Sequence, residues 1–163
     1  MALTACSEKI SEHPVAKNIE GIEDFPYEFK MPTYFPYQVE EVRVFDYFQT
    51  TEELPLNLAD AKPADFTLTI GFGDSSKDKF IFVEIRPFLE LKVSNNVSSK
   101  LIELDKGNIG IYYNDGRKQI FSWNEEMLNY QIIVFSTSKE DEPYLQEDLI
   151  KMANSLEPYK NNN

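Results

Sequence analysis

Residues 66–72 read Phe-Thr-Leu-Thr-Ile-Gly-Phe, so large apolar side chains alternate with threonine and glycine. Successive side chains of a β-strand point to opposite faces of its sheet, and this alternation therefore predicts a strand with one buried face. The segment from Phe80 to Ile85 follows after a polar loop and is apolar on both faces, as expected of a central strand. The two segments together predict a β-hairpin.

Strand signals continue on both sides of this hairpin. Residues 39–48 lie upstream and are rich in β-branched and aromatic side chains, and residues 99–104, 108–113, 119–123 and 128–135 follow downstream with the same character. Asp115-Gly116 separates two of these segments and is a strong hairpin signal, because both residues tolerate a positive φ. We expect a turn at residues 124–126 before the last strand. The pattern predicts a largely antiparallel sheet of about six or seven strands.

One helix is predicted near the C-terminus. Five apolar side chains share one helical face, at Leu145, Leu149, Met152, Ala153 and Leu156. Residues 138–141 supply capping side chains, Pro143 suits a first helical turn, and Glu157-Pro158 ends the helix. The predicted fold class is therefore α+β, with the C-terminal helix packed on one face of the sheet.

A segment of aromatic residues and prolines precedes the first strand. Residues 25–37 interleave Phe and Tyr with three prolines. Each proline lacks a backbone donor and pushes its predecessor toward extended conformations, so we expect an extended ribbon packed by its rings. The predicted organisation is a lipobox remnant and flexible tether at 1–24, a single α+β domain at 25–158 and a disordered tail at 159–163.

The N-terminal residues Leu3-Thr4-Ala5-Cys6 resemble a bacterial lipobox, in which the cysteine is lipidated and becomes the mature N-terminus. A lipidated cysteine carries at least two acyl chains, enough for stable anchoring. The basic and apolar regions of a secretory signal are not present before Cys6. Either the printed sequence begins just inside the cleavage site, or Cys6 is an ordinary cysteine near a start methionine. The first reading predicts lipidation of Cys6 at the outer face of the cytoplasmic membrane.

Composition excludes several classes of function. The chain of 163 residues has 28 acidic and 16 basic side chains, for a net charge of −12. Such a charge repels phosphates, so we expect no nucleic-acid partner and no polybasic contact with anionic lipid. Cys6 and His13 are the only residues of their kinds, which excludes an intramolecular disulfide and a zinc site of four Cys and His ligands.

The sequence offers no recognisable catalytic or metal-binding motif. It contains no Gly-x-Ser-x-Gly, and Gly71-Phe72-Gly73 ends a strand without a following helix. The loop 74–78 has two carboxylates, but Ile85 stands where a calcium-binding loop needs its glutamate. We therefore expect no catalytic residues, no metal site and no cofactor.

The carboxylates in the predicted strands are explained without a catalytic role. Three pairs of adjacent glutamates occur, at Glu40-Glu41, Glu52-Glu53 and Glu125-Glu126. Neighbouring strand residues point to opposite faces of the sheet, so we do not expect the two members of a pair to share a proton or a substrate. Glu84 lies within an apolar strand, and Arg86 shares its face two residues later. This spacing predicts an ion pair.

Aromatic residues gather in the last three strands before the helix. Tyr112 and Tyr113 must face opposite sides of the sheet, while Trp123 shares a face with Phe121. One interpretation is a ring-lined groove for a peptide, glycan or lipid, with candidate ligand contacts at Tyr112, Tyr113, Trp123 and Tyr130. The alternative is ordinary core packing with one tyrosine at the surface.

Several segments taken together resemble a known family. They are Leu101-x-Glu103-Leu104-x-x-Gly107, Ile109–Tyr113, Ile120-x-x-Trp123, Tyr130-x-Ile132 and a final helix over Asp148–Leu156 that contains Ala153-Asn154-Ser155. The chain from about Phe25 to Leu156 resembles the extracytoplasmic domain of unknown function found in Bacillus-type lipoproteins, sporulation proteins and the outer halves of anti-sigma regulators. The resemblance implies an α+β fold outside the cytoplasmic membrane of a Gram-positive cell, and it transfers no catalytic residues.

The sequence therefore predicts a membrane-anchored lipoprotein domain that acts as a non-catalytic binding or accessory module. Its ligand would be a protein, a wall component or a lipid. Two alternatives stay open: a sensor or regulatory domain for envelope stress or sporulation, and a hydrolase with an unrecognised carboxylate site. The oligomeric state is open as well.

Overall fold

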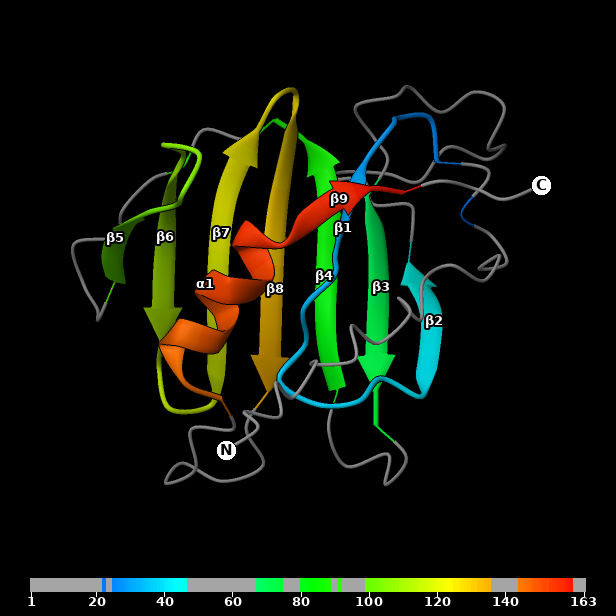
Figure 1. The fold of residues 1–163 in the computed structure, drawn as a ribbon, viewed down its shortest axis with the longest axis horizontal. Helices are drawn as coiled ribbons and strands as arrows, with labels where there is room; N and C mark the ends of the chain where they lie inside the picture. The colour runs from blue at the N-terminus through cyan, green and yellow to red at the C-terminus, as the bar shows by residue number, and fades with distance from the viewer. Residues whose placement is uncertain are drawn as a thin grey trace, which may run out of the picture.

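The fold was analysed in a computed structural model, which describes residues 22, 25–46, 67–74, 80–88, 91, 99–135 and 144–159. These residues form a seven-stranded sheet, a two-stranded sheet and one helix (Figure 1). All strand pairs are antiparallel. The predicted α+β class with a largely antiparallel sheet of six or seven strands is confirmed at this level.

The large sheet has the strand order β2-β3-β4-β8-β7-β6-β5. Its strands are β2 (Glu41–Asp46), β3 (Leu68–Gly73), β4 (Phe80–Pro87), β5 (Ser99–Glu103), β6 (Ile109–Asn114), β7 (Lys118–Glu125) and β8 (Leu128–Phe135). The predicted hairpin is β3–β4, with Ile70 opposite Val83. Strand β8 returns beside β4 after the β5–β6–β7 meander, so the two central strands are far apart in the sequence.

Of the two downstream hairpins, one turns at the predicted residues and the other does not. The β6–β7 turn uses Asp115-Gly116 as predicted, and Gly116 has a φ of 78°. The β7–β8 turn lies at Glu126-Met127, whereas the sequence predicted residues 124–126. Strand β7 continues through Glu125, which pairs with Leu128, and Glu126 takes up the turn with a φ of 57°.

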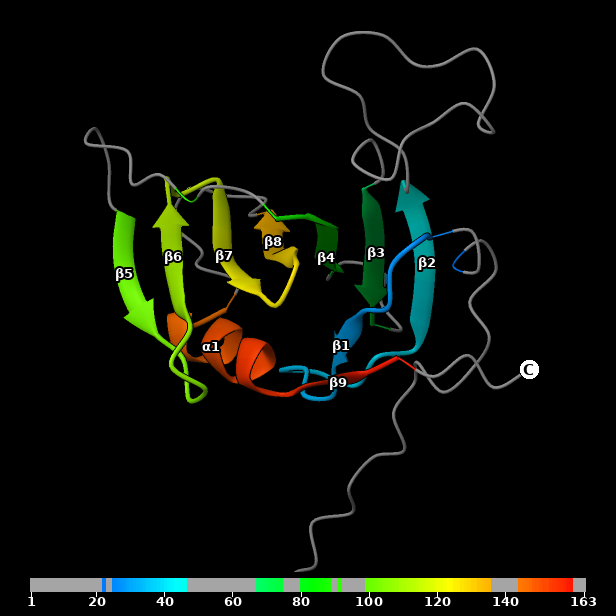
Figure 2. The ribbon, with the colours of Figure 1, turned by 90° about the horizontal axis from the view of Figure 1, so that it is seen from above.

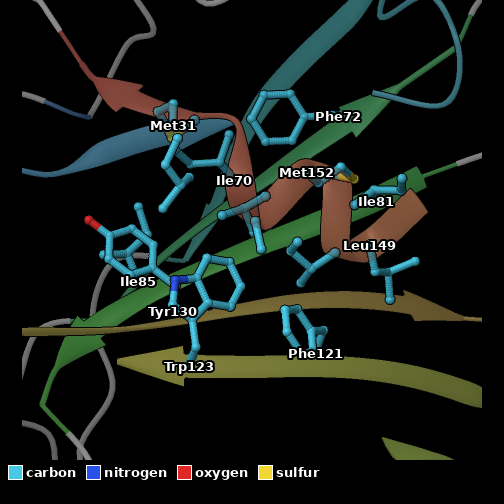
Figure 3. Close-up of a cluster of buried hydrophobic side chains, with 14 of the residues drawn as sticks. Met31, Ile70, Phe72, Ile81, Ile85, Phe121, Trp123, Tyr130, Leu149 and Met152 are labelled. Carbon is cyan, nitrogen blue, oxygen red and sulfur yellow. The ribbon is translucent and has the colours of Figure 1, made fainter. Parts of the chain in front are cut away.

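The hydrophobic core lies on the side of the large sheet that holds α1 (Gln146–Asn154), β1 (Lys30–Pro32) and β9 (Leu156–Pro158) (Figure 2). Leu149 and Met152 of the helix are fully buried and belong to the same hydrophobic cluster as Phe121 (Figure 3). The fully buried sheet residues alternate along each strand as the period-2 pattern predicted, and they include Leu68, Ile70, Phe72, Ile81, Val83, Ile85, Phe121, Trp123 and Ile132.

The helix is shorter than predicted. It begins at Gln146 with Leu145 in the extended N-cap position, and the Leu145 N–H donates to the Asp148 carboxylate at 3.3 Å. Residues 138–141 and Pro143 lie outside the described residues, so their predicted capping roles are not seen. The helix ends at Asn154, and Glu157-Pro158 belongs to β9. The reason is β1, which pairs with β9 and draws the chain out of the helical path.

The entry segment is extended and packed by its rings, as predicted. Phe25 packs edge-on against Phe29, with ring centroids 5.6 Å apart, and Phe29 stacks on Tyr159 at 5.1 Å. The Tyr159 N–H also donates to the Phe29 carbonyl. The described residues thus include Tyr159, the first residue of the predicted tail. It also includes Ile22 of the predicted tether, which is only 3% exposed.

Candidate functional site

The face of the seven-stranded sheet opposite α1, called here the open face, carries a row of apolar side chains. Phe82, Ile133, Ile120 and Tyr113 lie side by side on four neighbouring strands, because each is paired with the next in the strand register. Large apolar side chains are exposed around this row: Phe45 by 51%, Phe135 by 59%, Leu101 by 63% and Ile109 by 58%. The sheet is therefore apolar on both faces.

Four phenylalanines form a plate at one end of the open face, made up of Phe45, Phe80, Phe82 and Phe135. Their rings contact one another, largely edge to face, with centroids 5.1 to 5.9 Å apart. Phe45 and Phe80 pack over β3, which has glycine beneath them. A Cβ atom on Gly71 would lie 2.3 Å from the Phe45 ring, and one on Gly73 would lie 2.7 Å from the Phe80 ring.

A polar row runs across the open face beside the apolar row. The Arg86 guanidinium lies 3.3 Å from the Glu84 carboxylate, so the predicted ion pair is confirmed. Arg86 Nε also donates to Asn129 Oδ1 at 3.2 Å, and Asn129 Nδ2 donates to the Trp123 carbonyl at 3.0 Å. These groups bind one another and the backbone, so the polar row serves mainly to hold β4, β7 and β8 in register.

The open face carries a balanced set of described charges. Its described charged side chains are three acidic and three basic, at Glu41, Glu84, Glu103, Arg43, Arg86 and Lys118. Arg43 also pairs with Glu41. The other described side chains include ten acidic and five basic residues, so the acidic excess of the described side chains lies away from the open face.

The predicted ligand-contact aromatics do not form a groove. Trp123 is fully buried, and Tyr112 and Tyr130 are almost so, which places all three in the core beneath α1. Trp123 stacks on Tyr130 with centroids 5.5 Å apart, and Tyr130 Oη accepts a hydrogen bond from the Lys30 N–H (Figure 3). Their rings are closed to a ligand in this structure. Of the four, Tyr113 alone reaches the open face.

The phenylalanine plate was missed by sequence reasoning, although a signal for it exists. Phe80 and Phe82 are two residues apart on one strand, and Gly71 and Gly73 have the same spacing on the neighbouring strand. Paired glycines opposite paired aromatic residues indicate a place where the rings approach the neighbouring strand closely. Cys6, the predicted lipidation site, lies outside the described residues.

A charged cluster pins the entry segment to the β7–β8 hairpin. The Lys30 ammonium lies 2.7 Å from both Glu125 and Glu126, and Lys106 lies 3.4 Å from Glu125. The two adjacent glutamates converge, contrary to the prediction that they point apart, because Glu126 sits in the turn. Burial favours the neutral form of Glu125, but the two lysines outweigh it and lower its pKa. The carboxylates in turn raise the pKa of Lys30.

A second polar group is buried beside the start of α1. Gln119 Nε2 donates to the Tyr144 carbonyl at 2.9 Å and to Tyr112 Oη at 3.0 Å. Burial raises the pKa of Tyr144 to about 12, with smaller contributions from Asp74 and Asp148. Gln119 Oε1 and Tyr144 Oη are buried without a hydrogen-bond partner. The Tyr144 phenol, with its raised pKa, therefore stays neutral at physiological pH.

Within the described ranges, no three His, Cys, Asp or Glu side chains are placed to hold a metal ion. The same part of the chain contains no helix long and apolar enough to cross a membrane. Residues 75–79 of the acidic loop fall outside it. The described residues thus offer one extended feature that could contact a partner, the open face.

Comparison with protein-family models finds no match, and comparisons with curated proteins and with solved structures find none either. The last of the segments behind the resemblance, the end of the helix, makes packing contacts and hydrogen bonds in this structure. Asn154 Oδ1 accepts a hydrogen bond from the Asp105 N–H, Ser155 Oγ accepts from the Tyr34 N–H, and Leu156 is buried. The Ala-Asn-Ser-Leu sequence therefore ties the helix end to two other segments.

Proposed function

We propose that this chain is a non-catalytic binding or accessory module, held at the outer face of the cytoplasmic membrane by a lipid on Cys6. In this proposal α1 covers one face of the sheet, and the open face is the surface that binds a protein partner. The observation that carries it is the apolar row of the open face with its four exposed apolar neighbours, Phe45, Phe135, Leu101 and Ile109.

The chemistry of a sheet supports this proposal. An antiparallel sheet with one solvated face has polar side chains on that face, whereas strands that are apolar on both faces are covered on both. Strand β4 has Phe80 and Phe82 on the open face and Ile81 and Val83 on the core face. Large contiguous apolar patches on a protein surface mark sites of interaction. The lipobox resemblance and the tether-like residues after Cys6 support the attachment.

Photocrosslinking in the producing cell tests the binding surface. A photoreactive phenylalanine analogue replaces Phe135 on the open face, and the matched control replaces Leu145, which is 63% exposed at the start of α1. We expect a crosslinked polypeptide at position 135 that position 145 does not give. Absence of a crosslink at 135, or the same products at both positions, would contradict the proposal.

Lipidation is tested separately. The full-length natural gene is expressed in its own host with radiolabelled palmitate, beside a Cys6→Ser variant. We expect the wild-type protein to carry the label and sediment with membranes, and the variant to lose both properties. A label that survives in Cys6→Ser, or an unlabelled wild-type protein, would show that Cys6 is not the attachment site.

A further inference from the structure

We infer that the partner on the open face is a second copy of this chain, so that two sheets pack face to face with their helices outermost. This inference rests on the proposed function, because it names the occupant of the same surface. The resulting dimer would have four layers: helix, sheet, sheet and helix. Its interface would be isologous, with the same patch contributed by both copies.

Charge favours a second copy on this face. The chain carries a net charge of −12, so two copies repel each other at most orientations. The open face is the exception among the described residues, because its described charged side chains, three acidic and three basic, balance. Docking through it also leaves the acidic layers, with ten acidic and five basic described side chains each, on the two outer sides of the dimer.

The shape of the phenylalanine plate also fits a second sheet. The rings of Phe45 and Phe80 pack over Gly71 and Gly73 and meet each other edge to face, with an angle of 86° between their planes. Packed sheets meet at a separation of about 10 Å with interdigitating side chains, which suits apolar rings on both surfaces.

The apolar row and the polar row of the open face are both compatible with burial against a second copy. The apolar row of Phe82, Ile133 and Ile120 crosses the central strands, and the plate and Leu101 extend it toward the two edges. The polar row is already satisfied by its own hydrogen bonds and the Glu84–Arg86 pair, so it tolerates partial burial. Apolar side chains of one copy then meet apolar side chains of the other.

The test measures the mass of the full chain in solution by light scattering and sedimentation. We expect a concentration-dependent dimer for the wild type and a monomer for Phe135→Lys. Leu145→Lys adds the same charge on the opposite side of the sheet and should remain dimeric. Circular dichroism and thermal unfolding of each variant show whether it is folded. Interfaces of ordinary size bind at micromolar strength or tighter, so a wild-type monomer at about 100 µM overturns the inference.

Two further measurements separate this inference from the proposed function. The photoreactive analogue at position 135 of the purified chain should yield a product of twice the chain mass. If the wild type is monomeric but position 135 crosslinks to another protein in cells, the open face binds a different partner and the inference fails alone. If the wild type, but not Phe135→Lys, sediments with phosphatidylcholine vesicles and stays monomeric, the occupant is lipid and the inference again fails. No crosslink in cells or with the purified chain overturns both.

Discussion

Two glycines of the large sheet should respond differently to an added methyl group. A Cβ atom on Gly110 would lie 2.5 Å from the ring of Phe121, which is fully buried. A Cβ atom on Gly71 would meet the ring of Phe45, which is half exposed and free to swing outward. We expect Gly110→Ala to lower the free energy of unfolding by about 1 to 3 kcal/mol, and Gly71→Ala by less than about 1 kcal/mol. Urea denaturation of both variants measures this, and equal losses would mean that Phe45 is held in place.

The Lys30–Glu125 pair predicts a pH dependence of stability. The pKa of Glu125 is lowered from its ordinary 4.5, so its contribution is complete above pH 4.5 and is lost as the pH falls through the lower folded value. The pKa of Lys30 is raised from 10.5, so its contribution is complete below that pH and is lost as the pH rises further. Between these limits Lys30→Met should cost about 1 to 3 kcal/mol, because it removes the closest partner of a buried carboxylate.

Chemical denaturation of Lys30→Met and the wild type at several pH values checks this. The difference in the free energy of unfolding between the two proteins should be constant from about pH 5.5 to about pH 9, which lies between the two ordinary pKa values. It should shrink below about pH 4.5. Lys106 is half exposed and farther from Glu125, so Lys106→Met serves as the control and should cost less than about 1 kcal/mol. A difference that stays unchanged down to acid denaturation would show that the pair contributes nothing.

At the residue scale the sequence predicts which side chains share a face, and it does not predict what covers that face. The alternation in 66–72 and the Glu84–Arg86 spacing were both read correctly. Trp123 and Tyr130 were read as candidate ligand contacts, yet they are core residues. The difference is made by α1 and β1, which arrive from distant parts of the chain. Strand periodicity alone holds no information about their docking.

At the scale of elements, Ser155 joins the end of α1 to the entry segment. Its Oγ accepts hydrogen bonds from the N–H groups of Thr33 at 3.1 Å and Tyr34 at 3.0 Å, and it donates to the Met152 carbonyl at 2.8 Å. Ser155→Ala removes the acceptor of the Tyr34 N–H and should cost about 1 to 2 kcal/mol. Thermal unfolding measures the loss, and amide exchange at Tyr34 should become faster in the variant.

Thr33→Val is the matched control for this junction. It removes only the exposed hydrogen bond from Thr33 Oγ1 to the Ser155 carbonyl, and we expect a change within about 0.5 kcal/mol. If Ser155→Ala behaves like this control, the junction is held by apolar packing and not by the hydroxyl.

The same junction explains why the helix boundaries were predicted poorly. The apolar stripe located the helix, and Leu149 and Met152 are buried as it required. The stripe also continues to Leu156, which is buried in β9 and not in the helix. A helical and an extended residue can fill the same space in the core. The pairing of Pro32 with Leu156 decides between them, and that contact spans most of the chain.

At the scale of the whole molecule, the sequence predicts the strands but not their order. Each hairpin follows from a local turn signal, whereas the β4–β8 pair joins Ile81–Pro87 to Leu128–Val134 across the β5–β6–β7 meander. Both strands are apolar on the open face as well as on the core face, through Phe82 and Ile133. The most buried strands thus sit at the centre of the sheet, where burial on both faces is attainable.

Net charge gives a prediction for the molecule as a unit. The chain carries −12, and the acidic excess of its described side chains lies away from the open face. Raising sodium chloride from about 10 mM to about 150 mM shortens the screening length from about 30 Å to about 8 Å, which weakens repulsion between distant carboxylates. We therefore expect the unfolding temperature to rise with salt and the proposed dimer to tighten. A molecule stabilised mainly by surface ion pairs would show the opposite sign, because salt weakens those pairs.

Calorimetry and sedimentation at the two salt concentrations test both parts together. Potassium chloride at the same ionic strength should give the same shifts, since screening depends on ionic strength and not on the ion. Phe135→Lys separates the two effects: its unfolding temperature should still rise with salt, while its mass stays that of a monomer. If the unfolding temperature rises with salt only in the wild type, the repulsion acts between two copies of the chain and not within one copy.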